Sequence, residues 1–167
     1  MFIGEAPGYH EDQQGLPFVG PAGQLLNQLL ASIGLARRQV YIANVIKCRP
    51  TGNRDPLPTE MANCGKWLER QIELIKPRMI VTLGRYSMAR FFPGKTISKI
   101  HGTPRRQDGI VYYAMYHPAA ALHQQTLRPT LEADMLKIPS LLAEAQVETE
   151  AEPEVEPEAG PEQLSMF

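Results

Sequence analysis

Three polar side chains follow short apolar runs of the chain, and their types could support chemistry on a bound ligand. Glu5, Asn44 and His117 each come shortly after such a run. Open α/β sheets bind their ligands at the carboxyl ends of the strands, and a carboxylate on a glycine-rich loop there is suited to such a site. Together the three groups predict a site. Taken singly, Glu5 also fits a tight strand-to-helix turn, Asn44 an Asx turn, and His117 a structural residue before proline.

The elements that must position these groups alternate between strand and helix patterns. Apolar runs predict strands at residues 1–3, 40–43, 79–84 and 110–115. Helical spacing of apolar residues predicts helices at 21–33, from 58 or 59 to 76, around 88–91 and at 127–143. We expect the helix after Pro58 to bury Trp67 and Leu74, and we leave 95–106 open as a basic strand or hairpin. This alternation favours a parallel sheet with both faces covered, and its carboxyl ends would meet at one edge.

Composition bounds the class of protein. The 167 residues suggest one domain with a core, and no stretch is long and apolar enough to span a membrane, so no membrane partner is expected. Two cysteines make no disulfide framework, which favours a reducing, cytoplasmic compartment. Eight of the 18 acidic residues lie after Ala143, and no Lys or Arg does. The chain up to Ala143 therefore contains ten acidic and 17 basic residues. A basic globular part of this kind admits a polyanionic partner.

The motifs in their order resemble a known family. GEAPG, PFVGPAG, NVIKCRPTGNRDP followed by Cys64, IVTLG and YHPA are similar to the family 4 uracil-DNA glycosylases, from residue 1 to about 142. The resemblance implies a three-layer α/β/α fold with a central four-stranded, mostly parallel sheet. It also implies a base excision repair enzyme that flips uracil out of single- or double-stranded DNA and hydrolyses its N-glycosidic bond, leaving an abasic site. We expect a monomer.

The resemblance assigns roles to residues of the predicted site. Glu5 matches the acid that positions or activates the attacking water, and His117 matches the histidine that stabilises charge on the leaving base. Phe18 matches the aromatic that stacks on uracil, and Asn44 matches the amide that reads the uracil edge. Without the motif, Phe18 would be assigned to the core.

Further residues of the site follow from the same resemblance. Gly4 and Glu11 fall in the uracil-binding set, where Glu11 would help to exclude the thymine methyl group. An exposed glutamate in a loop is also often only solvated. The residues expected to contact DNA are Lys47, Arg49, Arg54, Pro118 and Ala119.

Cys48 and Cys64 are the cysteines of the chain. In the family they are two of four thiolates that hold a 4Fe–4S cluster, and a CxxC pair before the first strand supplies the others. That pair does not precede the first strand here, and two thiols do not complete a four-cysteine site. We therefore expect an N-terminally truncated domain whose cluster is incomplete or absent; the alternative is a relative that has lost its cluster.

The end of the chain differs in composition from the rest. The glycosylase domain is predicted at 1–143 and a disordered acidic Glu/Pro linker at 144–162. Residues 163–167 resemble the pentapeptide by which bacterial repair proteins bind the sliding clamp, which leaves a chance apolar terminus as the alternative. The residues expected to contact the clamp are Gln163, Leu164, Met166 and Phe167.

Two other functions remain in view at this point. One is a truncated relative that binds DNA or the clamp with weak or no catalysis. The other is a phosphate- or nucleotide-binding α/β domain, which is disfavoured because no glycine-rich loop carries a Lys-Ser/Thr pair. Substrate breadth beyond uracil stays open.

Overall fold

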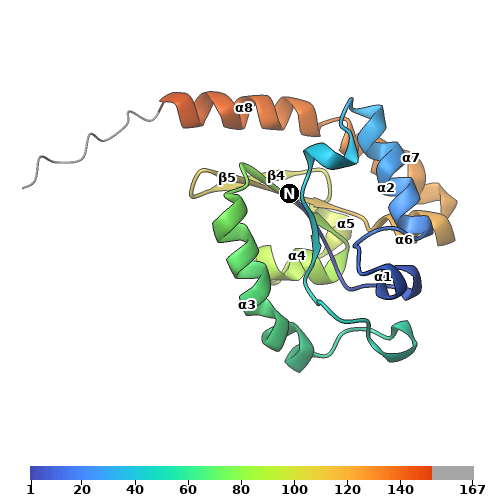
Figure 1. Ribbon diagram of the computed structural model, residues 1–167. Coiled ribbons are helices and arrows are strands. Elements are labelled where there is room, and N and C mark those ends of the chain that lie inside the picture. Colours follow the sequence, from blue (N-terminus) through green and yellow to red (C-terminus); the bar gives the residue numbers. More distant parts are fainter. Residues whose placement is uncertain (152–167) are drawn as a thin grey trace, which may run out of the picture.

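Five short strands form a central sheet in the computed structural model (Figure 1). The structure describes residues 1–151 and the side chains of residues 1–145. Within this part of the chain the sheet has five strands in the order β2-β1-β3-β5-β4. Their bounds are β1 Phe2–Gly4, β2 Ile42–Asn44, β3 Met79–Leu83, β4 Pro104–Gln107 and β5 Ile110–Met115. β2, β1, β3 and β5 are parallel, and β4 pairs antiparallel with β5 at one edge.

The register brings the carboxyl ends of the parallel strands to one edge. Gly4 is opposite Asn44, and Leu83 is opposite Met115. The loop after β1 and the segment after β5 therefore begin at the same edge at which β2 ends. This geometry gathers residues that lie more than a hundred positions apart in the sequence.

Helices cover both faces of the sheet (Figure 1). Their bounds are α1 Tyr9–Gln14, α2 Pro21–Ser32, α3 Pro58–Ile75, α4 Arg85–Phe91, α5 Ile97–Ile100, α6 Pro118–His123, α7 Arg128–Met135 and α8 Ile138–Ala151. Short 3₁₀ turns lie at Arg37–Gln39, Thr51–Asn53 and Gln125–Leu127. α2, α6, α7 and α8 pack on one face, whereas α3, α4 and α5 pack on the other.

Alternation along β3 explains the two cores. Met79, Val81 and Leu83 join the cluster under α2 and α7, and Ile80 joins the cluster under α3. Successive side chains of a strand point to opposite faces, so a strand with both faces covered is predominantly apolar. Every residue of β3 is buried.

Several sequence predictions need correction. The α/β/α fold and the parallel strands are confirmed, but the sheet has a fifth strand, β4. All four residues of β4 are exposed, so no apolar pattern marks it. Trp67 and Leu74 of α3 are 57% and 65% exposed, because the buried stripe of that helix runs through Leu68 instead.

The C-terminal elements differ from the prediction as well. The single helix expected at 127–143 is two helices, α7 and α8, and α8 continues to Ala151. Leu141 and Ala145 are both buried in the core, since a spacing of four places them on one side of the helix. The globular part therefore extends beyond residue 143. The rest of the predicted linker and the predicted clamp peptide at 163–167 lie outside the described residues.

Candidate active site

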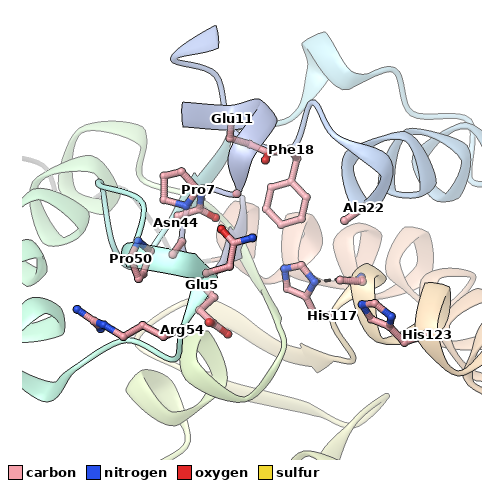
Figure 2. A pocket seen from close by; sticks show the side chains of 14 residues that line it. Glu5, Pro7, Glu11, Phe18, Ala22, Asn44, Pro50, Arg54, His117 and His123 are labelled. Carbon is pink, nitrogen blue, oxygen red and sulfur yellow. Dashed lines mark hydrogen bonds between the residues drawn. The ribbon is translucent and has the colours of Figure 1, made fainter. Parts of the chain in front are cut away.

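A cavity of about 450 Å³ opens at the carboxyl edge of the parallel strands (Figure 2). Figure 2 shows side chains from the loop after β1, the end of β2 and the start of α6 around one hollow. Of the residues predicted for the site, the cavity is lined by Glu5, Glu11, Phe18, Asn44, Arg54, His117 and Ala119. The fold thus brings together the carboxylate, the amide and the imidazole that the sequence placed after three different strands.

Asn44 offers an unused hydrogen-bonding atom to this cavity. It is the last residue of β2 and is only 6% exposed. Its Oδ1 is buried and has no hydrogen-bond partner within the described structure. Leaving a buried polar atom unpaired is unfavourable by about 1–3 kcal/mol, so such an atom in a cavity is suited to a ligand that supplies the missing donor.

His117 presents a neutral imidazole. It is the N-cap of α6, and its Nδ1 accepts a hydrogen bond from the backbone N–H of Ala119 at 3.1 Å. Burial lowers the pKa of His117 to about 4, against a smaller opposing effect of the Glu11 charge. At pH 7 the ring is therefore uncharged. Because Nδ1 accepts, the proton lies on Nε2, which makes Nε2–H a donor.

Phe18 forms a wall of the cavity beside His117. The two rings are stacked, with their centroids 5.4 Å apart and an interplanar angle of 25°. Phe18 is 5% exposed, so it is also part of the core, as its type alone suggested. Gly4 makes room for this arrangement, because a Cβ there would lie 2.5 Å from both the Phe18 ring and Asn44 Oδ1. Gly4 thus lies beneath the cavity rather than on its surface.

Glu5 is a half-buried carboxylate held in a mixed electrostatic setting. Burial raises its pKa, the negative charge of Asp55 raises it further, and Arg85 opposes both. Arg85 is itself paired with Asp55 at 2.6 Å. A carboxylate with a raised pKa accepts a proton more readily than an exposed one does, which suits a general base.

Glu11 is engaged by the backbone of the loop. Its Oε1 accepts hydrogen bonds from the N–H groups of Val19 at 2.8 Å and Gly20 at 2.7 Å. Burial alone would raise the pKa of Glu11, but these backbone donors outweigh it and lower the pKa. Glu11 is therefore charged, and at least one of its oxygens holds the loop in place.

The predicted DNA-contacting residues do not share one location. Arg54 lines the cavity and pairs with Glu60 through both guanidinium NH₂ groups, at 2.7 and 3.0 Å. Lys47 lies in a neighbouring cavity, where its Nζ donates hydrogen bonds to Asn44 O at 2.8 Å and to Gln71 Oε1 at 2.6 Å. Arg49 lies over the ring of Tyr9, 5.2 Å from its centroid. Pro118 is buried as the first residue of α6, so its role in the structure is to start that helix.

Cys48 and Cys64 are both free thiols, the first exposed and the second half-buried. Among the described residues, no group of three or more His, Cys, Asp or Glu side chains is placed to hold a metal ion. A 4Fe–4S cluster requires four ligands, so these two thiols do not by themselves form its site.

Sequence reasoning missed residues whose contacts depend on the fold. Asp55 and Arg85 lie thirty positions apart, yet together they set the charge around Glu5. Arg85 directly follows Gly84 at the end of β3, which was a usable signal because the other site residues also follow strands. His123 and Asn53 also line the cavity. Asn53 falls within the motif NVIKCRPTGNRDP but was assigned no role, and no pattern in the sequence marks His123.

Comparison with known proteins identifies the family of the chain. The family model of the uracil DNA glycosylase superfamily matches residues 1–138. The chain belongs to this superfamily, and the resemblance to the family 4 enzymes is confirmed.

Curated relatives place the chain near the type-4 members. A type-4 uracil-DNA glycosylase of Archaeoglobus fulgidus is 47% identical over 155 residues, covering 87% of this chain and 78% of the relative. One of Thermotoga maritima is 43% identical over 147 residues, 85% and 77% of the two chains. A type-5 uracil-DNA glycosylase of Pyrobaculum aerophilum is 33% identical over 150 residues, 79% and 66% of the two chains.

Between residues 1 and 151, no helix is both long and apolar enough to cross a membrane.

Proposed function

We propose that the protein excises uracil from DNA at this cavity. It hydrolyses the N-glycosidic bond between uracil and the sugar, which leaves an abasic site for base excision repair. The observation that carries this proposal is the buried Oδ1 of Asn44, which has no hydrogen-bond partner among the described residues, in a cavity walled by Phe18 and His117. The cavity volume falls in the usual range of about 300–1,000 Å³ for small-ligand sites. Superfamily membership and the type-4 relatives support the same activity.

Base recognition follows from the types and states of the wall residues. A uracil rotated out of the duplex stacks on Phe18, a contact of about 1–3 kcal/mol. Asn44 Oδ1 accepts from uracil N3–H, and the Asn44 amide donates to O4. Cytosine presents an acceptor at N3 and an amino group at position 4, so the same amide meets two mismatched groups.

Bond cleavage uses the two titratable groups of the cavity. Glu5 orients a water molecule toward C1′ and accepts its proton as the new C1′–O bond forms. The C1′–N1 bond breaks with its electron pair going to the base. The Nε2–H of neutral His117 donates a hydrogen bond to uracil O2 and stabilises the charge that develops there. The base leaves as an anion and takes its proton from solvent.

The test is uracil release from oligonucleotides that contain a single uracil, in single- and double-stranded form, with cytosine in its place as a negative control. Glu5→Gln, Asn44→Ala and His117→Ala should each lower the single-turnover rate by at least about tenfold. The matched control is Glu73→Gln, which makes the same chemical change in an exposed pair with Arg70 and should keep full activity. Full activity of the three site variants would refute the site. An inactive wild type that still binds DNA would favour the binding-only alternative.

The predicted partner of the C-terminal residues is proposed on sequence grounds. Leu164, Met166 and Phe167 on an acidic tether offer a short apolar peptide that can occupy a groove of a bacterial sliding clamp. Deleting residues 163–167 should abolish clamp binding in a pull-down and leave uracil release from free oligonucleotides unchanged. Retained clamp binding would refute this assignment.

A further inference from the structure

The turn that carries Phe18 has an unusual backbone. Phe18 has φ +52°, in the left-handed region that residues with a Cβ rarely adopt. This conformation turns the Phe18 ring into the cavity, where it stacks on His117. An aromatic residue does not hold such a conformation by itself, so other contacts must stabilise it.

Arg37 supplies one set of these contacts. It lies in the 3₁₀ turn Arg37–Gln39, and its guanidinium reaches back to the turn from outside the cavity. Its Nη1 donates to Phe18 O at 3.0 Å, and its Nη2 donates to Pro17 O. A guanidinium suits this task because its two NH₂ groups form a fixed fork that reaches two neighbouring carbonyls at once.

Glu11 supplies the complementary set from the other end of the turn. Its carboxylate accepts from the N–H groups of Val19 and Gly20, the two peptides that follow Phe18. A cation thus binds the carbonyls of Pro17 and Phe18, and an anion binds the next two amides. Hydrogen bonds to charged partners are stronger than neutral ones, and the two charges match the direction of the peptide dipoles.

Close packing against α2 completes the support. A Cβ at position 23 would lie 1.9 Å from Phe18 O and 2.1 Å from its carbonyl carbon, so the turn rests directly on the helix at Gly23. The Phe18 carbonyl therefore has little freedom to rotate away from Arg37. Arg37, Glu11 and Gly23 thus all contact the backbone of this turn.

We infer that Arg37 is a positioning residue for the reaction: it holds the Pro17–Phe18 turn so that the Phe18 ring stays in place to stack on the extruded base. This inference rests on the proposed function, because it names what supports the base-stacking wall of that same site. Arg37 is not among the residues that line the cavity, and it acts through the backbone of Phe18.

The kinetic test compares Arg37→Ala with Arg38→Ala, which removes the same charge from the next, exposed position of the 3₁₀ turn. Rates are measured under single-turnover conditions with saturating enzyme, so that a smaller folded fraction does not alter them. Arg37→Ala should lower the excision rate about ten- to thirtyfold with unchanged affinity for uracil-free DNA. Arg38→Ala should match the wild type. Millimolar guanidinium chloride, against equal sodium chloride, should restore part of the rate of Arg37→Ala alone.

A double-mutant cycle with Phe18→Ala shows whether Arg37 acts through the ring. In the Phe18→Ala background, Arg37→Ala should cause little further loss, because the ring that it positions is gone. Equal rates for Arg37→Ala and the wild type, or full additivity in the cycle, would overturn the inference. Should Arg37→Ala fail to fold, Arg37→Lys serves instead, because one ammonium cannot reproduce the fork. Wild-type rates for Arg37→Lys would then overturn it.

A measurement independent of activity separates this inference from the proposed function. The Phe18 ring shields the stacked His117 ring, so the ring-proton NMR signals of His117 report where Phe18 lies. They should shift in Arg37→Ala and stay in place in Arg38→Ala. A wild type that releases no uracil would refute the proposed function, while these signals still decide on Arg37: unchanged signals in Arg37→Ala overturn its role, and shifted ones support it.

Discussion

Lowering the pH from 7 to 5 should destabilise the fold through His117. The pKa of this histidine is lowered from 6.5 to about 4, mainly because the ring is buried. Between these two values the unfolded chain binds a proton at this position and the folded chain does not. The free energy of unfolding therefore rises with pH over this window. Above about pH 6.5 protonation of the unfolded chain does not reduce it, and the reduction grows as the pH falls toward 4.

The magnitude follows from the size of the pKa difference. A pKa that falls from 6.5 to about 4 corresponds to about 3–4 kcal/mol between the two protonation states, at about 1.4 kcal/mol for each tenfold change in proton affinity. Between pH 7 and pH 5 the free energy of unfolding falls by about 2 kcal/mol of this amount. At pH 5 the imidazole of residue 117 is almost fully protonated in the unfolded state and mostly unprotonated in the folded state.

Urea unfolding of the wild type and of His117→Gln at a series of pH values measures this effect. The glutamine side chain of this variant does not titrate, so the loss of stability from pH 7 to 5 should be about 2 kcal/mol smaller in the variant than in the wild type. Contributions of groups that do not interact with His117 cancel in the difference. Parallel curves for the wild type and His117→Gln would refute the reasoning about a buried, neutral His117.

Two further predictions concern other parts of the site. Asp55→Asn removes a charge that raises the pKa of Glu5 and frees Arg85 to lower it, so the acid limb of the pH–rate profile should move to lower pH. Gly4→Ala places a Cβ 2.5 Å from Asn44 Oδ1, so it should cost about 1–3 kcal/mol in the free energy of unfolding by urea and lower the excision rate as well.

Both predictions have a matched comparison. Asp108→Asn removes an exposed carboxylate remote from Glu5 and should leave the acid limb in place. An acid limb unchanged in Asp55→Asn would contradict the electrostatic setting described for Glu5. Gly65→Ala adds a Cβ that meets only the flexible end of Arg90, at 3.3 Å, and should be tolerated. Equal behaviour of Gly4→Ala and Gly65→Ala would contradict the close packing beneath the cavity.

The convergence of Glu5, Asn44 and His117 could be predicted from the sequence for a physical reason. Each follows an apolar run, the runs alternate with helical patterns, and parallel strands align their carboxyl ends. The prediction needs only the order of elements and no knowledge of side-chain contacts. The same logic explains why the residues of β3 were recognised as a buried central strand.

Other parts of the site depend on contacts that no local pattern records. The left-handed conformation of Phe18 is set by Arg37 and Glu11, which are far from one another in the sequence. The pair of Asp55 and Arg85 joins the loop before α3 to the start of α4. Such contacts arise only once the tertiary structure has formed, and so the family resemblance assigned Phe18 to the site without showing which contacts support it.

The central position of β1 has a consequence for the order of folding. Phe2 pairs with Ile42 on one side and with Val81 on the other, so this three-residue strand gains its place only through contacts that are distant in the sequence. Such pairings form late, because closing long loops opposes them, while helices such as α2 and α3 form locally and early. We expect Glu5 and Asn44 to remain apart until β1 pairs with β2, which brings Gly4 opposite Asn44. The reactive edge of the sheet is thus assembled by the slowest contacts of the fold.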